Sequence, residues 1–132
     1  MLPNSLLIID DDRDFITLID FVFKEDSNWE VLAETNGNQG VATAKLIQPD
    51  IILLDVVMPE IDGFAIYKLL KYNLLTCNIL IIFVSAKAWI KEEVKSRIAE
   101  DVLVITKPFD ILELHSQLDN QLDKLCNEQK IA

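Results

Sequence analysis

The sequence has no apolar run that is long enough to cross a membrane. A transmembrane helix needs roughly 18 or more consecutive apolar residues, and polar residues interrupt every apolar run of this 132-residue chain well before that length. The N-terminal residues Met1-Leu2-Pro3-Asn4 also lack the basic region that opens a signal peptide. We therefore expect no membrane insertion and no export.

Cysteine and basic residues are scarce as well. The spacing of Cys77 and Cys126 matches neither a metal site nor a disulfide framework, so we interpret them as reduced thiols of a cytoplasmic protein. Only 12 Lys and Arg accompany 22 Asp and Glu, which gives a net charge of −10. Because polyanion binding relies on Lys and Arg that displace counterions, we expect no direct contact with nucleic acid.

Apolar, β-branched runs alternate with amphipathic segments along the whole chain, without an internal repeat or a linker. The runs that predict strands lie at about residues 5–9, 29–34, 51–54, 79–84 and 102–105. The segments between them carry apolar residues at helical spacing, and the last predicted helix runs from about 110 to 128 with Asp110 as N-cap. Such alternation predicts an α/β domain, a parallel sheet with helices on both faces.

Two of the predicted strands end directly in carboxylates. Asp10 and Asp11 follow the first strand, and Asp55 follows the third. Because ligands of an open α/β sheet bind beyond the carboxyl ends of its strands, these acids are expected to share one pocket. Like charges about 4 Å apart repel by roughly 4 kcal/mol at a surface-like dielectric, and a bound cation offsets that repulsion. Hard carboxylate oxygens suit Mg²⁺, so we predict a magnesium site there.

Three further properties give this pocket a chemistry. Asp55 follows four aliphatic residues, and beside a cation its carboxylate can act as a nucleophile that forms an acyl phosphate. Lys107 precedes Pro108, so an extended or cis turn there would aim its amine across the pocket. Ser85 ends the fourth predicted strand, and its hydroxyl can bond a phosphate oxygen.

Over nearly its whole length the chain resembles the receiver domain of two-component response regulators. The matching segments, in family order and spacing, are Asp10-Asp11; Pro49 to Asp55, followed by Met58-Pro59 and Asp62-Gly63; Ser85 to Ala88; and Lys107-Pro108-Phe109. The resemblance implies a flavodoxin-like three-layer (βα)5 sandwich whose five parallel strands have the order 2-1-3-4-5. It also implies a single stand-alone, CheY-like receiver over residues 1–132, with a core at about 5–128 and no output domain.

The resemblance further implies a function in signalling. Asp55 would accept a phosphoryl group from a histidine kinase or a phosphotransfer protein. Asp11 and Asp55 would bind Mg²⁺ directly, Asp10 would act through water, and the backbone carbonyl of Val57 would be another ligand. The added charge of about −1.5 to −2 would switch binding to a downstream effector protein. The chain would catalyse only its own phosphorylation and dephosphorylation, as a cytoplasmic monomer or weak homodimer.

The same resemblance assigns roles to the remaining pocket residues. Lys107 would pair with the bound phosphate, Ser85 would move toward it, and Val57 and Lys87 would tune the lifetime of the phosphoryl group. Val104 stands where the family often has Tyr or Phe, three residues before the lysine, and Glu100-Asp101-Val102 replaces the usual Gly-Ala-Asp turn. These departures concern the coupling to output rather than the phosphate chemistry.

Two other functions remain open. A receiver-fold interaction domain that no longer takes phosphate is favoured weakly by Val104 and opposed by the complete set of acids and Lys107. A phosphatase of the haloacid dehalogenase type also uses a strand-end Asp-x-Asp pair, which Asp10 and Asp12 satisfy, with Asp10 as nucleophile. That motif continues with a small hydroxyl residue, whereas this chain has Asp14.

Several residues outside the pocket have plain structural interpretations. His115, the only histidine, is interpreted as a solvated residue of the last helix. Trp89 fits an exposed anchor for a partner and simple packing about equally well. The apolar spacing at 111, 118 and 125 fits packing of one helix on the sheet, with dimerisation as the alternative. The acids interpreted as helix caps or solvated residues are Asp12, Asp14, Glu25 and Asp26.

Overall fold

A parallel β-sheet forms the centre of the protein. The computed structural model describes residues 2–107 and 110–131, and for residue 111 and residues 126–131 it describes the backbone alone. Within these residues the sheet has the strand order β2-β1-β3-β4-β5, as predicted, and a helix follows each strand. The strands are β1 (Asn4–Ile9), β2 (Trp29–Glu34), β3 (Ile51–Asp55), β4 (Leu80–Ser85) and β5 (Val104–Thr106). The helices are α1 (Arg13–Phe23), α2 (Gly37–Ile47), α3 (Gly63–Lys71), α4 (Ile90–Arg97) and α5 (Ile111–Ile131).

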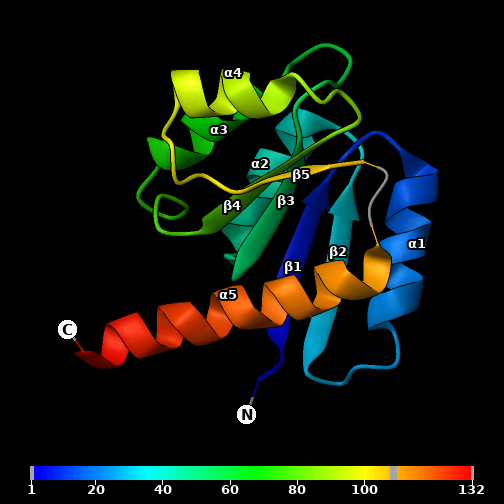
Figure 1. Cartoon of the computed structure of the whole chain (residues 1–132), viewed down its shortest axis with the longest axis vertical. Coiled ribbons are helices and arrows are strands. Elements are labelled where there is room, and N and C mark those ends of the chain that lie inside the picture. Colours follow the sequence, from blue (N-terminus) through cyan, green and yellow to red (C-terminus); the bar gives the residue numbers. More distant parts are fainter. Residues whose placement is uncertain (1, 108–109, 132) are drawn as a thin grey trace.

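Helices cover both faces of the sheet and make three layers (Figure 1). Successive side chains of a strand point to opposite faces, so each buried strand supplies two cores. Leu7 and Ile9 of β1 belong to the core under α2, α3 and α4. Leu6 and Ile8 belong to the core under α1 and α5. Burial on both faces explains why the strands read as unbroken apolar runs.

Polar residues at the strand ends begin the following helices. The Asp12 carboxylate accepts hydrogen bonds from the backbone N–H groups of Asp14 and Phe15, both at 3.1 Å. Asp110 does the same for the first turn of α5, with the Leu112 N–H at 2.9 Å from its oxygen. Both acids are therefore N-caps, as predicted, and such caps are typically worth about 1 kcal/mol each.

The fifth strand differs from its prediction. β5 begins at Val104, two residues later than the apolar run suggested, and extends to Thr106. Leu103 still accepts a hydrogen bond from the Phe83 N–H at 3.0 Å, but regular pairing starts only at Val104. β5 is an edge strand with β4 as its one neighbour, so apolar composition alone does not determine where its ladder starts.

His115 was wrongly predicted to be solvated. Its Nε2 atom lies 2.8 Å from an oxygen of Asp26, and its ring packs edge-on against Phe23 with the centroids 4.5 Å apart. Trp89 is 59% exposed, which favours the exposed interpretation over packing. Among the described helices, none is both long and apolar enough to pass through a bilayer.

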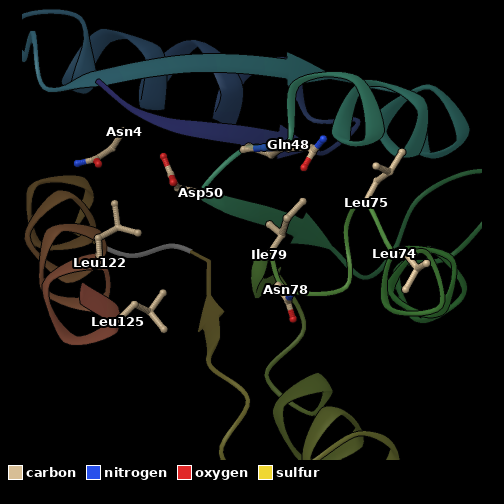
Figure 2. Close-up of a pocket in the computed structure, with 10 residues that line it drawn as sticks. Asn4, Gln48, Asp50, Leu74, Leu75, Asn78, Ile79, Leu122 and Leu125 are labelled. Carbon is tan, nitrogen blue, oxygen red and sulfur yellow. The ribbon is translucent and has the colours of Figure 1, made fainter. Parts of the chain in front are cut away.

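The apolar stripe of α5 packs on the sheet along part of its length. Leu118 is fully buried, whereas Leu122 and Leu125 line a pocket of about 320 Å³. This pocket lies at the amino ends of the strands, where the leucines share it with Asn4 and Asp50 (Figure 2). Asp50 is the one carboxylate among the described residues that line it, and among the described side chains of the predicted stripe only Leu118 is fully buried on the sheet. The predictions for Pro108, Phe109, Cys126 and the side chain of Ile111 lie outside the described residues.

Candidate functional site

Three carboxylates meet where the strand order reverses. Asp10 follows β1 directly and Asp55 is the last residue of β3, the strand beside it. An oxygen from each of Asp10, Asp11 and Asp55 lies within 4.8 Å of the other two. Asp10 is 1% and Asp55 7% exposed, whereas Asp11 lies on the surface. The cluster therefore joins two buried acids to one surface acid, at the position where doubly wound sheets bind ligands.

The turn after β1 fixes the direction of Asp10. Its N–H continues the ladder by donating to the Glu34 carbonyl at 3.1 Å, and its carboxylate accepts the Asp12 N–H at 2.9 Å. The chain then enters α1 at once, capped by Asp12. The three consecutive acids thus differ: Asp10 is buried, Asp11 is exposed with an oxygen near Asp10 and Asp55, and Asp12 caps the helix.

Lys107 brings a positive charge to the pocket from β5. Its Nζ atom lies 2.8 Å from Asp10 Oδ2 and 3.6 Å from Asp12 Oδ2. Its backbone N–H donates to the Ser85 carbonyl at 2.8 Å, which ties it to the end of β4. The ammonium also lies 4.2 Å from the centroid of the Phe15 ring, a favourable cation–π distance. The predicted convergence of Lys107 with the acids is therefore present in the structure.

The pocket changes the acidity of Asp55. Burial is the main cause, and the nearby Asp10 charge adds to it, so the pKa of Asp55 rises from its ordinary value near 3.8 to about 8. The Lys107 charge and the Val57 N–H, 3.3 Å from Asp55 Oδ1, oppose the rise without cancelling it. Without a further cation, the Asp55 carboxyl group therefore holds its proton near neutral pH.

Ser85 ends β4 beside these groups. The side chain is buried, and its Oγ atom accepts the Lys87 backbone N–H at 3.0 Å. Acceptance of that bond leaves the hydroxyl hydrogen as a donor for a phosphate oxygen. Val57 follows Asp55 by two residues and its side chain is 50% exposed, and Lys87, two residues after Ser85, is also exposed.

Gly63 holds the loop after β3 against the pocket. Its N–H donates to the Val56 carbonyl at 2.8 Å. A Cβ atom at this position would lie 2.5 Å from the Asp55 carbonyl oxygen and 2.7 Å from Val56 Cα. Both are backbone atoms that have little room to move, so the close approach requires glycine.

Two contacts of the pocket were not predicted. Phe15 is a buried residue of α1, and its ring also lies beneath the Lys107 ammonium. Asp12 was assigned as a cap, and its second oxygen also faces Lys107. Both pairs join residues far apart in the chain, so no local pattern in the sequence marks them.

The sequence matches a known family along most of its length. Residues 6–119 match the family model described as the response regulator receiver domain. The chain is 34% identical over 107 residues to the protein PilH of Pseudomonas aeruginosa, which covers 80% of this chain and 86% of PilH. It is 28% identical over 127 residues to sporulation initiation phosphotransferase F of Bacillus subtilis, with 96% and 100% coverage.

Other relatives are longer than this chain. It is 31% identical over 109 residues to the DNA-binding dual master transcriptional regulator RpaA of Synechocystis, which covers 83% of this chain and 45% of RpaA. The chain spans about half the length of the first curated relatives that it matches, between 45% and 51%.

Solved structures agree on the fold. The receiver domain of a LuxO-type repressor protein from Vibrio parahaemolyticus superposes with a TM-score of 0.82 at 16% identity, over 99% of this chain and 98% of that one. The chemotaxis protein CheY4 of Vibrio cholerae gives a TM-score of 0.78 at 20% identity, over 89% of this chain and 98% of that one.

The phosphatase alternative required Asp10 as nucleophile, but the Asp10 carboxylate is buried and paired with Lys107. This chain belongs to the response regulator receiver domain family.

Proposed function

We propose that this receiver domain accepts a phosphoryl group on Asp55 from a histidine kinase or a phosphotransfer protein. One observation carries the proposal: the Asp55 carboxylate ends β3 within 4.8 Å of two other acids, and the Lys107 ammonium lies at the same strand ends. A nucleophile, a cation site and a counter-charge for phosphate oxygens are then present in one pocket.

The pocket fits a divalent cation. Three carboxylates accompany one ammonium. Burial and the Asp10 charge raise the pKa of Asp55, so a further positive charge would favour its ionised form. Asp10, Asp11, Asp55 and the Val57 carbonyl offer oxygen ligands only, which suits Mg²⁺. When bound, Mg²⁺ would supply charge neutralisation for the oxygens of the transferring group.

The residues divide the transfer step among them. An Asp55 oxygen bonds to phosphorus while the bond from phosphorus to the donor imidazole nitrogen breaks, and the donor keeps that electron pair. Lys107 turns from Asp10 toward a phosphoryl oxygen, a short movement because all these groups share the pocket. The Ser85 hydroxyl moves toward the phosphoryl group and donates its hydrogen to one of the phosphate oxygens. Through these two movements, the charge of the phosphoryl group would change the conformation of the loops that carry Ser85 and Lys107, and so the surface that a partner meets.

The chain would act as a catalyst only on itself. Hydrolysis of the acyl phosphate needs water at the open side of the pocket, where Asp11, Val57 and Lys87 form the rim. Their size and charge would then control how long the phosphoryl group lasts.

We further propose a cytoplasmic protein, monomeric or weakly dimeric, that passes its signal to another protein. Its charge of −10 opposes direct nucleic-acid binding by this domain. Trp89 is exposed just before α4, four residues after Ser85, and is a suitable anchor for an effector. Val104 is half-buried in β5 and carries no ring, so the signal would leave through the loop after β4.

Acetyl phosphate with Mg²⁺, followed by intact mass measurement, tests the proposal. The wild-type chain is expected to gain one phosphoryl group, and Asp55→Asn to gain none. Asp20→Asn removes an exposed acid of α1 and is the matched control, which keeps the gain. A wild-type chain that gains no phosphoryl group would instead be a receiver-fold interaction domain.

A further inference from the structure

A second cluster of ionisable residues lies away from the strand-end pocket. Asp26 belongs to the turn between α1 and β2, and His115 and Asp119 lie one turn apart on α5. Asp26 precedes the start of β2, which pairs with the start of β1, so the cluster is at the opposite end of these strands from Asp10. Phosphoryl transfer does not use these residues.

The ligand atoms of the cluster converge. His115 Nε2 lies 2.8 Å from Asp26 Oδ2 and 3.8 Å from Asp119 Oδ2. One atom from each of the three residues lies within 4.8 Å of the other two. The i, i+4 spacing places His115 and Asp119 on one face of α5, and Asp26 approaches that face from the turn.

Each carboxylate is oriented by a donor behind it. The indole N–H of Trp29 donates to Asp119 Oδ1 at 2.7 Å, which leaves Oδ2 directed at the imidazole. The Asn28 N–H donates to Asp26 Oδ1 at 2.9 Å, with the same result for Asp26 Oδ2.

The surrounding aromatic rings make the arrangement rigid. Phe23 is buried and meets His115 edge-on, and the ring of Trp29 meets Phe23 edge-on with the centroids 5.3 Å apart. The imidazole therefore has a fixed plane. Hydrogen-bonded outer groups of this kind orient metal ligands in proteins.

We propose that Asp26, His115 and Asp119 form a binding site for a transition-metal ion of the zinc class. Bonds of about 2.0–2.1 Å to a tetrahedral Zn²⁺ place neighbouring ligands roughly 3.4 Å apart. The distance from His115 Nε2 to Asp119 Oδ2, 3.8 Å, is close to that value. The distance from His115 Nε2 to Asp26 Oδ2, 2.8 Å, would have to lengthen by about half an ångström. Imidazole favours Zn²⁺ over Mg²⁺, so this site differs in selectivity from the all-oxygen pocket.

The site is open to ions and to water. The side chains of His115, Asp26 and Asp119 are 25%, 23% and 46% exposed, which permits access and a water molecule in the fourth position. A bound ion would link the turn before β2 to α5. It would thereby stabilise the packing of α5 on α1, because metal affinity for the folded state alone adds to folding stability.

Zinc titration by calorimetry tests the site on untagged protein with Mg²⁺ in excess. Cys77 and Cys126 are replaced by Ala in all samples so that thiols do not bind the probe. The expected result is one binding event whose affinity falls at least tenfold in His115→Asn and in Asp119→Asn. Trp29→Phe is expected to lower the affinity by about 10–100-fold, because it removes the donor that orients Asp119. Glu113→Gln, which removes an exposed acid of the same helix, is the matched control.

A second measurement needs no variant. His115 is the only histidine, so its imidazole resonances report on ligation directly in the wild-type chain. Zinc is expected to shift these resonances and Mg²⁺ to leave them in place. Unshifted resonances, or zinc affinity that is equal in the wild type and in His115→Asn, overturn the proposal. Zinc binding that depends on Asp11 instead of His115 also overturns it.

Discussion

The ammonium of Lys107 and the carboxylate of Asp10 form a buried ion pair across the ends of β5 and β1, with 2.8 Å between Nζ and Oδ2. The Asp10 side chain is 1% exposed, so its charge has little access to solvent. Removal of one partner from a buried pair costs more than the pair contributes, because it leaves a charge without compensation. Loss of Lys107 is therefore expected to destabilise the fold.

Replacement of Lys107 by Met should lower the free energy of unfolding by about 3 kcal/mol, because it leaves the buried Asp10 carboxylate without its counter-charge. Urea unfolding in EDTA measures the loss. Addition of Mg²⁺ should restore part of it by replacing the missing positive charge. Lys91→Met changes an exposed lysine of α4 and serves as control. An equal effect of the two substitutions would contradict the stabilising role of the ion pair.

The raised pKa of Asp55 predicts an unusual pH dependence. Asp55 holds its proton up to about pH 8 in the fold, whereas the unfolded chain releases it near 3.8. The folded state then binds more protons in this window, so stability falls as pH rises through it. The pKa values of Asp12 and Asp26 are lowered from 3.8 in the fold. These two residues therefore contribute stability that is lost only as pH falls below about 3.8, outside the range in which Asp55 acts. Urea unfolding in EDTA between about pH 5 and pH 8 measures the slope.

Asp55→Asn should remove most of that slope, because Asn does not titrate. Magnesium affinity should rise with pH over the same window, because a Mg²⁺ ion bound as proposed would have to displace the Asp55 proton. A slope that is unchanged in Asp55→Asn would mean that another group is responsible.

Gly63→Ala should impair phosphorylation by displacing the end of β3. The new Cβ atom would meet the backbone of Asp55 and Val56. Overpacking of this kind costs about 1–3 kcal/mol, and a shift of Asp55 should slow the reaction with acetyl phosphate roughly tenfold or more. Gly37→Ala is the control, since the three atoms nearest to its Cβ atom belong to the side chains of Ile61 and Ile66 and none is a backbone atom. Equal rates in the two variants would argue against the positioning role of Gly63.

The fold and most of the site follow from local features of the sequence. Two-sided burial produces solid apolar runs, and parallel strands bring their carboxyl ends to one edge, so the meeting of Asp10, Asp11 and Asp55 was predictable. The start of β5 was not, because an edge strand with one neighbour depends on pairing. The partners of His115 were not either, because 89 residues separate it from Asp26 and no helical periodicity encodes that contact.

The loop after β3 contains a residue in a conformation that its side chain disfavours. Glu60 has φ at 71°, in the left-handed region. A residue with a Cβ atom is less stable there by roughly 1–2 kcal/mol, because the Cβ atom approaches the carbonyl oxygen. The loop joins Asp55 to the N-cap of α3, so its strain acts on the proposed phosphorylation site.

Glu60→Gly should raise the free energy of unfolding by on the order of 0.5–1 kcal/mol, the relief of strain less the larger entropy of glycine in the unfolded chain. The substitution also removes one negative charge from a chain whose net charge is −10, and Glu60→Ala separates the two effects. Alanine removes the same charge and keeps the Cβ atom, so only the glycine variant should show the conformational gain. Urea unfolding of both variants in EDTA decides the matter. If the two gain equally, the charge of Glu60 and not its backbone destabilises the loop.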